Sequence, residues 1–182
     1  MQIIRQHDLV ETPWKNGGGI TRNIAQEGDT SGPLWRLSMA DVDRNGEFSS
    51  FPGMTRILTV IKGDNMMLHR PNGAMLARYA VPMTFDGSTP ITATLGQGPI
   101  RNFNLMFDTA QCVGKARVVR EPGVTDFGRA DQTGVLHVIA GHAQVEGAVL
   151  DMGDTVISTA MPISFDLPDD AAALIITLRA KD

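Results

Sequence analysis

Glycine or proline interrupts almost every stretch of this sequence that is long enough for a buried helix. The 182 residues include 19 glycines and 10 prolines, and both residue types destabilise helix interiors. Between these interruptions lie short segments in which apolar residues alternate with polar or small ones, the period of a half-buried strand. The clearest alternation is in residues 35–42 and 102–107, whereas residues 56–61 are rich in β-branched side chains and end at the turn signal Lys62-Gly63-Asp64. Many short strands separated by turns predict an all-β fold, either a sandwich or a barrel.

Two segments recur at a distance near half the chain length, which indicates a tandem duplication. Residues 56–63 are similar to 134–141, a shift of 78 residues, and residues 81–86 are similar to 161–166, a shift of 80. The alternative is that two β domains share turn residues by chance. We predict two fused antiparallel barrels in one compact chain, covering residues 1–108 and 109–182, and leave open whether they exchange strands.

The charge of the chain argues against nucleic acid and membranes as partners. The formal net charge is −4 and the basic residues are scattered singly, whereas a nucleic-acid-binding surface is typically basic. No run approaches the ~18 apolar residues of a membrane span, and the N-terminus lacks the apolar centre of a signal peptide. The single cysteine, Cys112, cannot form an intramolecular disulfide, which favours a reducing compartment. We expect a cytoplasmic protein.

The sequence offers little for metal or nucleophilic catalysis. The histidines His7, His69, His137 and His142 lack the close His-x-His pair and following Glu of a metal-binding barrel. Cys112 has no neighbours that would activate a thiol, and no Gly-x-Ser-x-Gly motif is present. We therefore predict no bound metal and no cofactor.

The sharpest local feature is a run of three glycines flanked by hydrogen-bond donors. The run and its flanks comprise Lys15, Asn16, Gly17, Gly18, Gly19, Thr21 and Arg22. Consecutive glycines cost chain entropy. They either permit a sharp turn or expose backbone N–H groups that bind an anion, and both interpretations stay open. The spacing matches neither a phosphate-binding P-loop nor a dinucleotide fingerprint.

The 35–42 strand places Arg36 and Ser38 on the face opposite to Trp35. An arginine on such a face usually meets solvent, but inside a barrel it would require an anion.

Two further segments suit a ligand site. In 48–56, Phe48 and Phe51 are expected to pack a loop, while the role of Arg56 stays open. Asn102 and Asn104 share a strand face, where they either hold a carboxylate or formyl oxygen or satisfy nearby backbone groups.

In these segments the sequence resembles the HutD/Ves family. The matching motifs are Pro-Trp-Lys-Asn-Gly-Gly-Gly-Ile-Thr-Arg at 13–22, Trp-Arg-Leu-Ser-Met-Ala at 35–40, Phe-Ser-x-Phe-Pro-Gly-x-x-Arg at 48–56 and Asn-Phe-Asn-Leu-Met at 102–106. The resemblance implies a bicupin fold, two fused cupin-like jelly rolls, without the usual metal ligands. It also implies a regulatory role in bacterial histidine utilisation through binding of N-formylglutamate or a similar small acid. The family usually has Asp at the position of Asn102, and basic residues where this chain has Phe107 and Asp108.

Residues and resemblance together predict a site for a small anionic metabolite, because arginine holds carboxylates through paired hydrogen bonds. The predicted ligand-binding residues are Lys15, Asn16, Gly17, Gly18, Gly19, Thr21, Arg22, Arg36, Ser38, Arg56, Asn102 and Asn104. The first alternative is a metal-free hydrolase or isomerase acting on a small acidic amino-acid derivative. Catalysis needs a proton-transfer group, and the motifs are poor in His and carboxylates, which favours binding. A second alternative is a protein that acts through its surface, and homodimer formation through sheet edges stays open.

Overall fold

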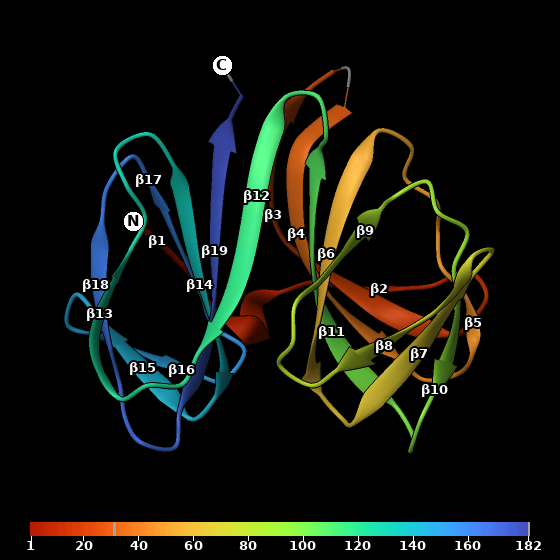
Figure 1. Cartoon of the computed structure of the whole chain (residues 1–182). Coiled ribbons are helices and arrows are strands. Elements are labelled where there is room, and N and C mark those ends of the chain that lie inside the picture. The colour runs from red at the N-terminus through yellow and green to blue at the C-terminus, as the bar shows by residue number, and fades with distance from the viewer. Residues whose placement is uncertain (31, 182) are drawn as a thin grey trace. The chain divides into compact units, whose positions relative to one another are not determined.

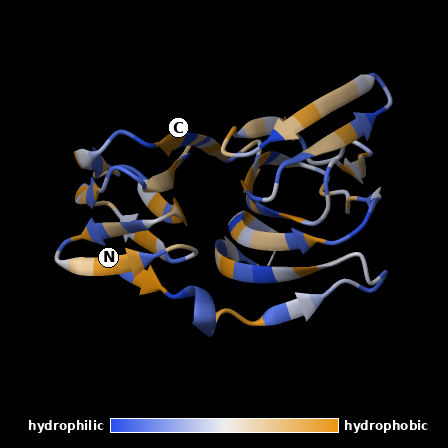
Figure 2. Cartoon of the chain, turned by 90° about the horizontal axis from the view of Figure 1, so that it is seen from below, coloured by the Kyte–Doolittle hydropathy of each residue, from blue (hydrophilic) through white to orange (hydrophobic). Residues whose placement is uncertain are grey.

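The computed structural model describes residues 1–30 and 32–181, and its regular structure is almost entirely antiparallel strand (Figure 1). The predicted all-β fold is confirmed. Within the described ranges the strands form open sheets, since the first and last strands of a sheet do not pair with each other. This corrects the prediction of closed barrels. Alternation still explains the sheets, because apolar and polar bands follow one another along the strands (Figure 2) and strand neighbours point to opposite faces.

One compact unit spans Val10–Cys112. Its larger sheet has the order β2 (Glu11–Pro13), β3 (Gly19–Asp29), β4 (Gly32–Val42), β11 (Ile100–Asp108), β6 (Met54–Lys62) and β9 (Met83–Asp86). Its smaller sheet has the order β5 (Gly46–Glu47), β10 (Thr92–Leu95), β7 (Asn65–Arg70) and β8 (Gly73–Arg78). Buried residues of both sheets, such as Leu58, Val60, Met66 and Leu68, form one apolar cluster. The unit is therefore a sandwich whose core lies between its sheets.

The second compact unit combines Met1–Leu9 with Val113–Asp182. Its larger sheet has the order β1 (Gln2–Ile4), β17 (Thr155–Thr159), β14 (Thr133–Ala140), β19 (Ala172–Ala180) and β12 (Cys112–Val119). Its smaller sheet has the order β13 (Gly123–Phe127), β18 (Ile163–Leu167), β15 (His142–Val145) and β16 (Ala148–Asp151). Phe127 and Phe165 contact edge to face, with ring centroids 5.8 Å apart, in an apolar cluster that again draws on both sheets.

The N-terminal segment belongs to the second unit, so the units differ from the predicted ranges 1–108 and 109–182. Strand β1 pairs with β17, and the short 3-10 helix η1 (Gln6–Asp8) follows it. The Arg5 guanidinium donates to the Asp154 carboxylate at 2.6 Å, and the Gln6 backbone N–H donates to the same side chain at 2.9 Å. Sequence proximity gave no sign of these contacts, since they join residues nearly 150 positions apart.

Both units have the same strand order, which supports the expected duplication. In the larger sheets β4-β11-β6-β9 corresponds to β12-β19-β14-β17, and in the smaller sheets β5-β10-β7-β8 corresponds to β13-β18-β15-β16. The first repeat match joins the equivalent strands β6 and β14. Their following glycines, Gly63 and Gly141, both have positive φ, and an added Cβ would lie 2.8 Å from the Pro99 carbonyl oxygen and 3.0 Å from Ala171, respectively. The second match is wrong, because it aligns β9 with β18, which belong to different positions in the topology.

Candidate functional site

The Val10–Cys112 unit contains a cavity of about 480 Å³. Its wall combines the larger sheet with Glu47 at the end of β5 and with two loop segments, residues 14–16 and 48–51. The lining residues are Thr12, Pro13, Trp14, Lys15, Asn16, Thr21, Arg36, Ser38, Ala40, Glu47, Phe48, Ser49, Phe51, Arg56, Asn102, Asn104 and Met106. This volume is in the range of small-molecule sites.

Strand register places the polar wall residues on the sheet face that also forms the core. Residues directly opposite in antiparallel strands share a face. Met106 on β11 lies opposite Arg36 on β4 and Arg56 on β6. The next row joins Asn104 with Ser38 on one side and with Leu58, a member of the apolar cluster, on the other. The two arginines are two strand spacings apart, about 10 Å between their backbones, so their long side chains approach one compartment.

Arg56 is the most unusual residue of the cavity wall, because its charge is buried without a carboxylate partner among the described residues. The residue is 5% exposed, and burial lowers the pKa of Arg56 to about 10. It donates to the Ser49 carbonyl at 3.3 Å and to the Asn104 side-chain carbonyl at 3.1 Å. Its Nε atom has no hydrogen-bond partner. A buried cation is costly unless it is paired.

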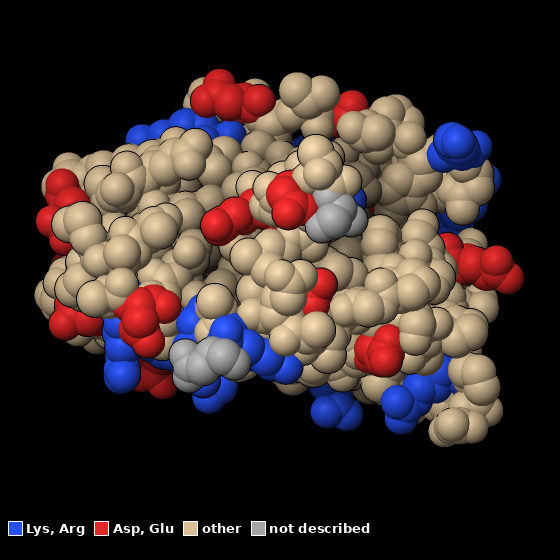
Figure 3. All heavy atoms as spheres, turned by 90° about the horizontal axis from the view of Figure 1, so that it is seen from above, with Lys and Arg blue, Asp and Glu red and all other residues tan. Residues whose placement is uncertain are grey.

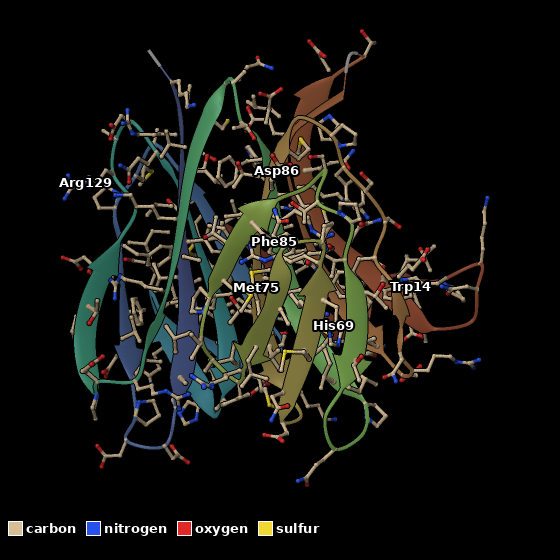
Figure 4. All side chains as sticks on the ribbon, turned by 45° about the vertical axis from the view of Figure 1, so that its right-hand side comes forward. Trp14, His69, Met75, Phe85, Asp86 and Arg129 are labelled. Atoms are coloured by element: carbon tan, nitrogen blue, oxygen red, sulfur yellow. The ribbon has the colours of Figure 1, made fainter. Side chains whose placement is uncertain are left out.

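Three aromatic rings surround the Arg56 guanidinium. Its central carbon lies 5.3 Å from the Phe48 centroid, 5.4 Å from that of Phe51 and 5.1 Å from that of Phe85, within the range of cation–π attraction. Phe85, which is labelled in Figure 4, belongs to β9. The expectation that Phe48 and Phe51 only pack a loop is therefore corrected, since both rings also hold this arginine. Their proximity to Arg56 in sequence was the available signal.

Two consecutive side-chain hydrogen bonds connect Arg56 to Asn104 and Asn104 to Asn102 on the cavity wall. The Asn104 carbonyl accepts from Arg56, and the Asn104 amide nitrogen donates to the Asn102 carbonyl at 2.5 Å. A guanidinium only donates, so this direction is fixed by Arg56. The Asn102 amide N–H groups consequently point elsewhere, and they have no acceptor among the residues that the structure describes. Asn102 and Asn104 are both at least 96% buried.

Arg36 lies half-buried on the cavity wall, and burial lowers its pKa. Its guanidinium donates to the Asn23 side-chain carbonyl through Nε at 2.9 Å and also through Nη2. Arg36 therefore lines the cavity while part of its side chain still meets solvent. Neighbouring Ser38 is buried on the same wall. The indole N–H of Trp14 (Figure 4) donates to the Thr21 hydroxyl at 2.7 Å, on another part of the wall.

The triple glycine serves the turn rather than the cavity wall. Gly17 has φ +66° and donates its N–H to the Trp14 carbonyl at 2.9 Å, and Gly18 donates to the Asn16 side chain at 2.9 Å. A Cβ on Gly19 would lie 2.1 Å from the Asp41 carbonyl oxygen. These three glycines do not line the cavity. The predicted anion-binding role of the Gly17 and Gly18 amides is corrected, because both amides are already hydrogen-bonded inside the loop.

Arg22 also lies outside the cavity lining. It donates to Asp41 at 2.8 Å and to Glu11 at 2.5 Å, and Arg101 donates to the same Asp41 carboxylate at 2.5 Å. Burial alone would raise the pKa of Asp41, but hydrogen bonds from Arg101 and Arg22 lower it. Arg22 alternates with the cavity-lining Thr21 along β3, so its side chain is on the other face. Its predicted role in the ligand site is therefore corrected to that of an ion-pair network.

The remaining predicted residues lie together on the cavity wall. Eight of the twelve line the cavity, namely Lys15, Asn16, Thr21, Arg36, Ser38, Arg56, Asn102 and Asn104. Sequence reasoning missed Trp14, Glu47 and Met106, of which Trp14 and Met106 stand inside the quoted motifs. Glu47 gave no signal, because a lone exposed carboxylate before a loop is ordinary.

The wall presents more cations than anions. Within the described lining, the charged residues are Lys15, Arg36 and Arg56 against Glu47, a difference of two positive charges. The chain as a whole carries −4, and both signs of charge occur across the face shown in Figure 3, so this excess is local. Nowhere in residues 1–30 and 32–181 do three or more His, Cys, Asp or Glu residues gather in a way that suits a metal ion. No helix of the described chain is long and apolar enough to cross a membrane.

Fold and site define an all-β protein of cupin-like architecture with an arginine-lined cavity. The structure is similar to a cupin 2 conserved barrel domain protein from Leptotrichia buccalis, with a TM-score of 0.60, 9% identity and coverage of 99% and 96% of the two chains, which shows the fold alone. The HutD family model matches residues 6–175. The chain therefore belongs to the HutD family.

Individual relatives agree with this assignment. HutD from Pseudomonas fluorescens SBW25 is 31% identical, with a TM-score of 0.88 and coverage of 100% of this chain and 99% of that one. An uncharacterised 21.2 kDa protein of the hutC 3′ region in Pseudomonas putida is 34% identical, covering 81% of this chain and 78% of its own length. Protein Ves from Citrobacter koseri is 36% identical, with coverage of 75% and 72%.

Proposed function

We propose that the cavity binds a small carboxylate metabolite of the formylglutamate type and that this binding has a regulatory role in histidine utilisation. The observation that carries the proposal is the buried Arg56 without a carboxylate partner among the described residues. A carboxylate guest would supply the missing counter-charge and accept hydrogen bonds from the terminal nitrogens of this cavity-lining guanidinium. Binding energy would thereby offset a cost that the empty protein carries.

The second arginine supports an acid with two polar ends. Arg36 and Arg56 lie about 10 Å apart at the backbone and flank Met106 on one face. A short dicarboxylate or acyl amino acid spans the gap between two converging arginine side chains. The pathway part of the proposal rests on the HutD family and on the hutC-region relative. The bicupin description of the whole chain also stays a proposal, supported by the repeated strand order.

The test is isothermal titration calorimetry with N-formylglutamate, glutamate, urocanate and formate. The expected result is saturable binding of at least one acid that is reduced at least 10-fold in Arg56→Met, corresponding to loss of a charge-assisted hydrogen bond. Arg70→Met is the matched control, because Arg70 is exposed on β7 of the same unit and outside the cavity. Absence of binding for every acid, or equal loss in both variants, would overturn the proposal.

The alternative function is that of an enzyme, and one residue of the cavity wall could serve as its proton-transfer group. Glu47 is the carboxylate on the described cavity wall, and a general base must reach the reacting proton. Turnover of N-formylglutamate that disappears in Glu47→Gln, with binding retained, would place catalysis above simple binding.

A further inference from the structure

We propose that Asn102 is the specificity-determining residue of this cavity and that it selects a ligand group that accepts hydrogen bonds over one that donates them. The inference rests on the proposed function and names the chemistry at the end of the ligand that Arg56 does not hold. It is based on the hydrogen bonds that join Arg56, Asn104 and Asn102, whose donor-to-acceptor direction is fixed.

An asparagine side chain can ordinarily present either its carbonyl or its amide nitrogen, because the two ends have nearly the same shape. Here that freedom is removed. Arg56 has only N–H bonds to offer, so the Asn104 carbonyl must face it, at 3.1 Å. The Asn104 nitrogen must then face the Asn102 carbonyl, at 2.5 Å. Only the nitrogen end of Asn102 is left for a guest.

Burial makes this direction expensive to reverse. Asn102 is 1% exposed and Asn104 is 4% exposed. Turning Asn102 would place its nitrogen against the Asn104 nitrogen, so two donors would meet while a carbonyl lost its partner. Leaving buried polar groups unpaired is costly. The Asn102 nitrogen is therefore a preorganised donor, and it has no acceptor among the described residues.

The consequence is a wall that offers donors from two directions. Arg56 and Asn102 both offer N–H groups, and both line the cavity. A carboxylate, or an acyl oxygen, satisfies such a wall at each end of the ligand. An ammonium group would place its own N–H donors against the N–H donors of the wall. Its positive charge would also be repelled by the excess of cations there. Such a wall discriminates strongly between ligands, because a ligand without acceptors leaves the wall donors unpaired and therefore binds more weakly.

The test compares glutarate with 5-aminopentanoate by calorimetry. The two probes have similar length and share one carboxylate, but the other end is an acceptor in the first and a cationic donor in the second. The wild-type protein is expected to bind glutarate at least 10-fold more tightly. Asn102→Asp replaces the donor nitrogen by a carboxylate oxygen. This variant is expected to bind glutarate about 10- to 100-fold more weakly, which is the effect of losing one charge-assisted hydrogen bond. The same variant is expected to bind 5-aminopentanoate more tightly, so the preference for glutarate over 5-aminopentanoate becomes smaller or reverses.

Asn72→Asp is the matched control, because it makes the same change of charge on an exposed turn of the same unit, outside the cavity. It is expected to change neither affinity by more than about 2-fold. Should Asn102→Asp fail to fold, Asn102→Ala removes the donor without adding charge, and it is expected to weaken glutarate without strengthening 5-aminopentanoate.

The outcomes separate the two proposals. If no acid binds the wild-type protein, the proposed function fails. If N-formylglutamate binds but glutarate does not, or if Asn102→Asp keeps the wild-type preference, the proposed function stands and the role of Asn102 is overturned.

Discussion

Replacing Arg56 by methionine should make the empty protein more stable. Burial lowers the pKa of Arg56 to about 10, well below the ordinary pKa of an arginine side chain. At about 1.4 kcal/mol per pH unit, this fall corresponds to about 3 kcal/mol against the charged form in the folded protein. The penalty is fully present at neutral pH, because a basic group with a lowered folded-state pKa destabilises the fold at every pH below that value.

The substitution also removes favourable contacts, and their size decides the net effect. The buried hydrogen bond to Asn104 contributes about 1 kcal/mol. The hydrogen bond to the Ser49 carbonyl is long, at 3.3 Å, and water replaces it in an exposed loop. Methionine keeps apolar and sulfur contacts with Phe48 and Phe85. Loss of the cation–π attraction to the three rings costs about 1 kcal/mol more. The expected net gain is therefore about 1 kcal/mol, a rise in melting temperature of about 2–4 °C for a chain of this size.

The assay is thermal unfolding without ligand at neutral pH, with Arg70→Met as the control. Arg70 is exposed, so its replacement should leave the melting temperature within about 2 °C. A melting temperature of Arg56→Met at or below that of the wild-type protein would refute the reasoning, because it would mean that the Arg56 charge is not a stability cost.

Other consequences of the structure are equally open to measurement. Asp154→Asn should lower the free energy of unfolding by about 2 kcal/mol in urea titrations, because the Arg5 contact weakens; no change would show that this contact contributes nothing. Burial alone would raise the pKa of Asp154, but backbone and Arg5 hydrogen bonds lower it, so the stability from this carboxylate should be present above its unfolded-state pKa and lost as the pH falls below about 4. Wild-type protein should therefore lose more stability than Asp154→Asn in that range. Gly19→Ala should lower soluble yield or cost at least about 3 kcal/mol, because the new Cβ meets the Asp41 carbonyl, whereas Gly46→Ala meets nothing within 4 Å and should be tolerated.

Local pattern accounts for much of the fold and for part of the site. Strand period predicted that Arg36 and Ser38 share a face, and strand register confirmed it by placing both on the cavity wall. Sequence alone left the environment of Arg36 open, because the alternation of side chains is the same whether a face meets solvent or a second sheet. The triple glycine was ambiguous for a similar reason, since a turn and an anion site both require small residues.

The sequence by itself predicted that this chain forms short antiparallel strands and that its arginines and asparagines gather in the motifs of the HutD family. It also indicated a duplication, which the repeated strand order supports. These properties follow from side-chain period, turn residues and motif order, all of which are local. Only the tertiary structure decided that Arg22 pairs with Asp41, that Arg56 is buried with no carboxylate partner in residues 1–30 and 32–181, and that residues 1–9 join the second unit. Such partners lie up to about 150 positions apart, and hydrogen-bond geometry between them exists only after strands from distant parts of the chain have paired.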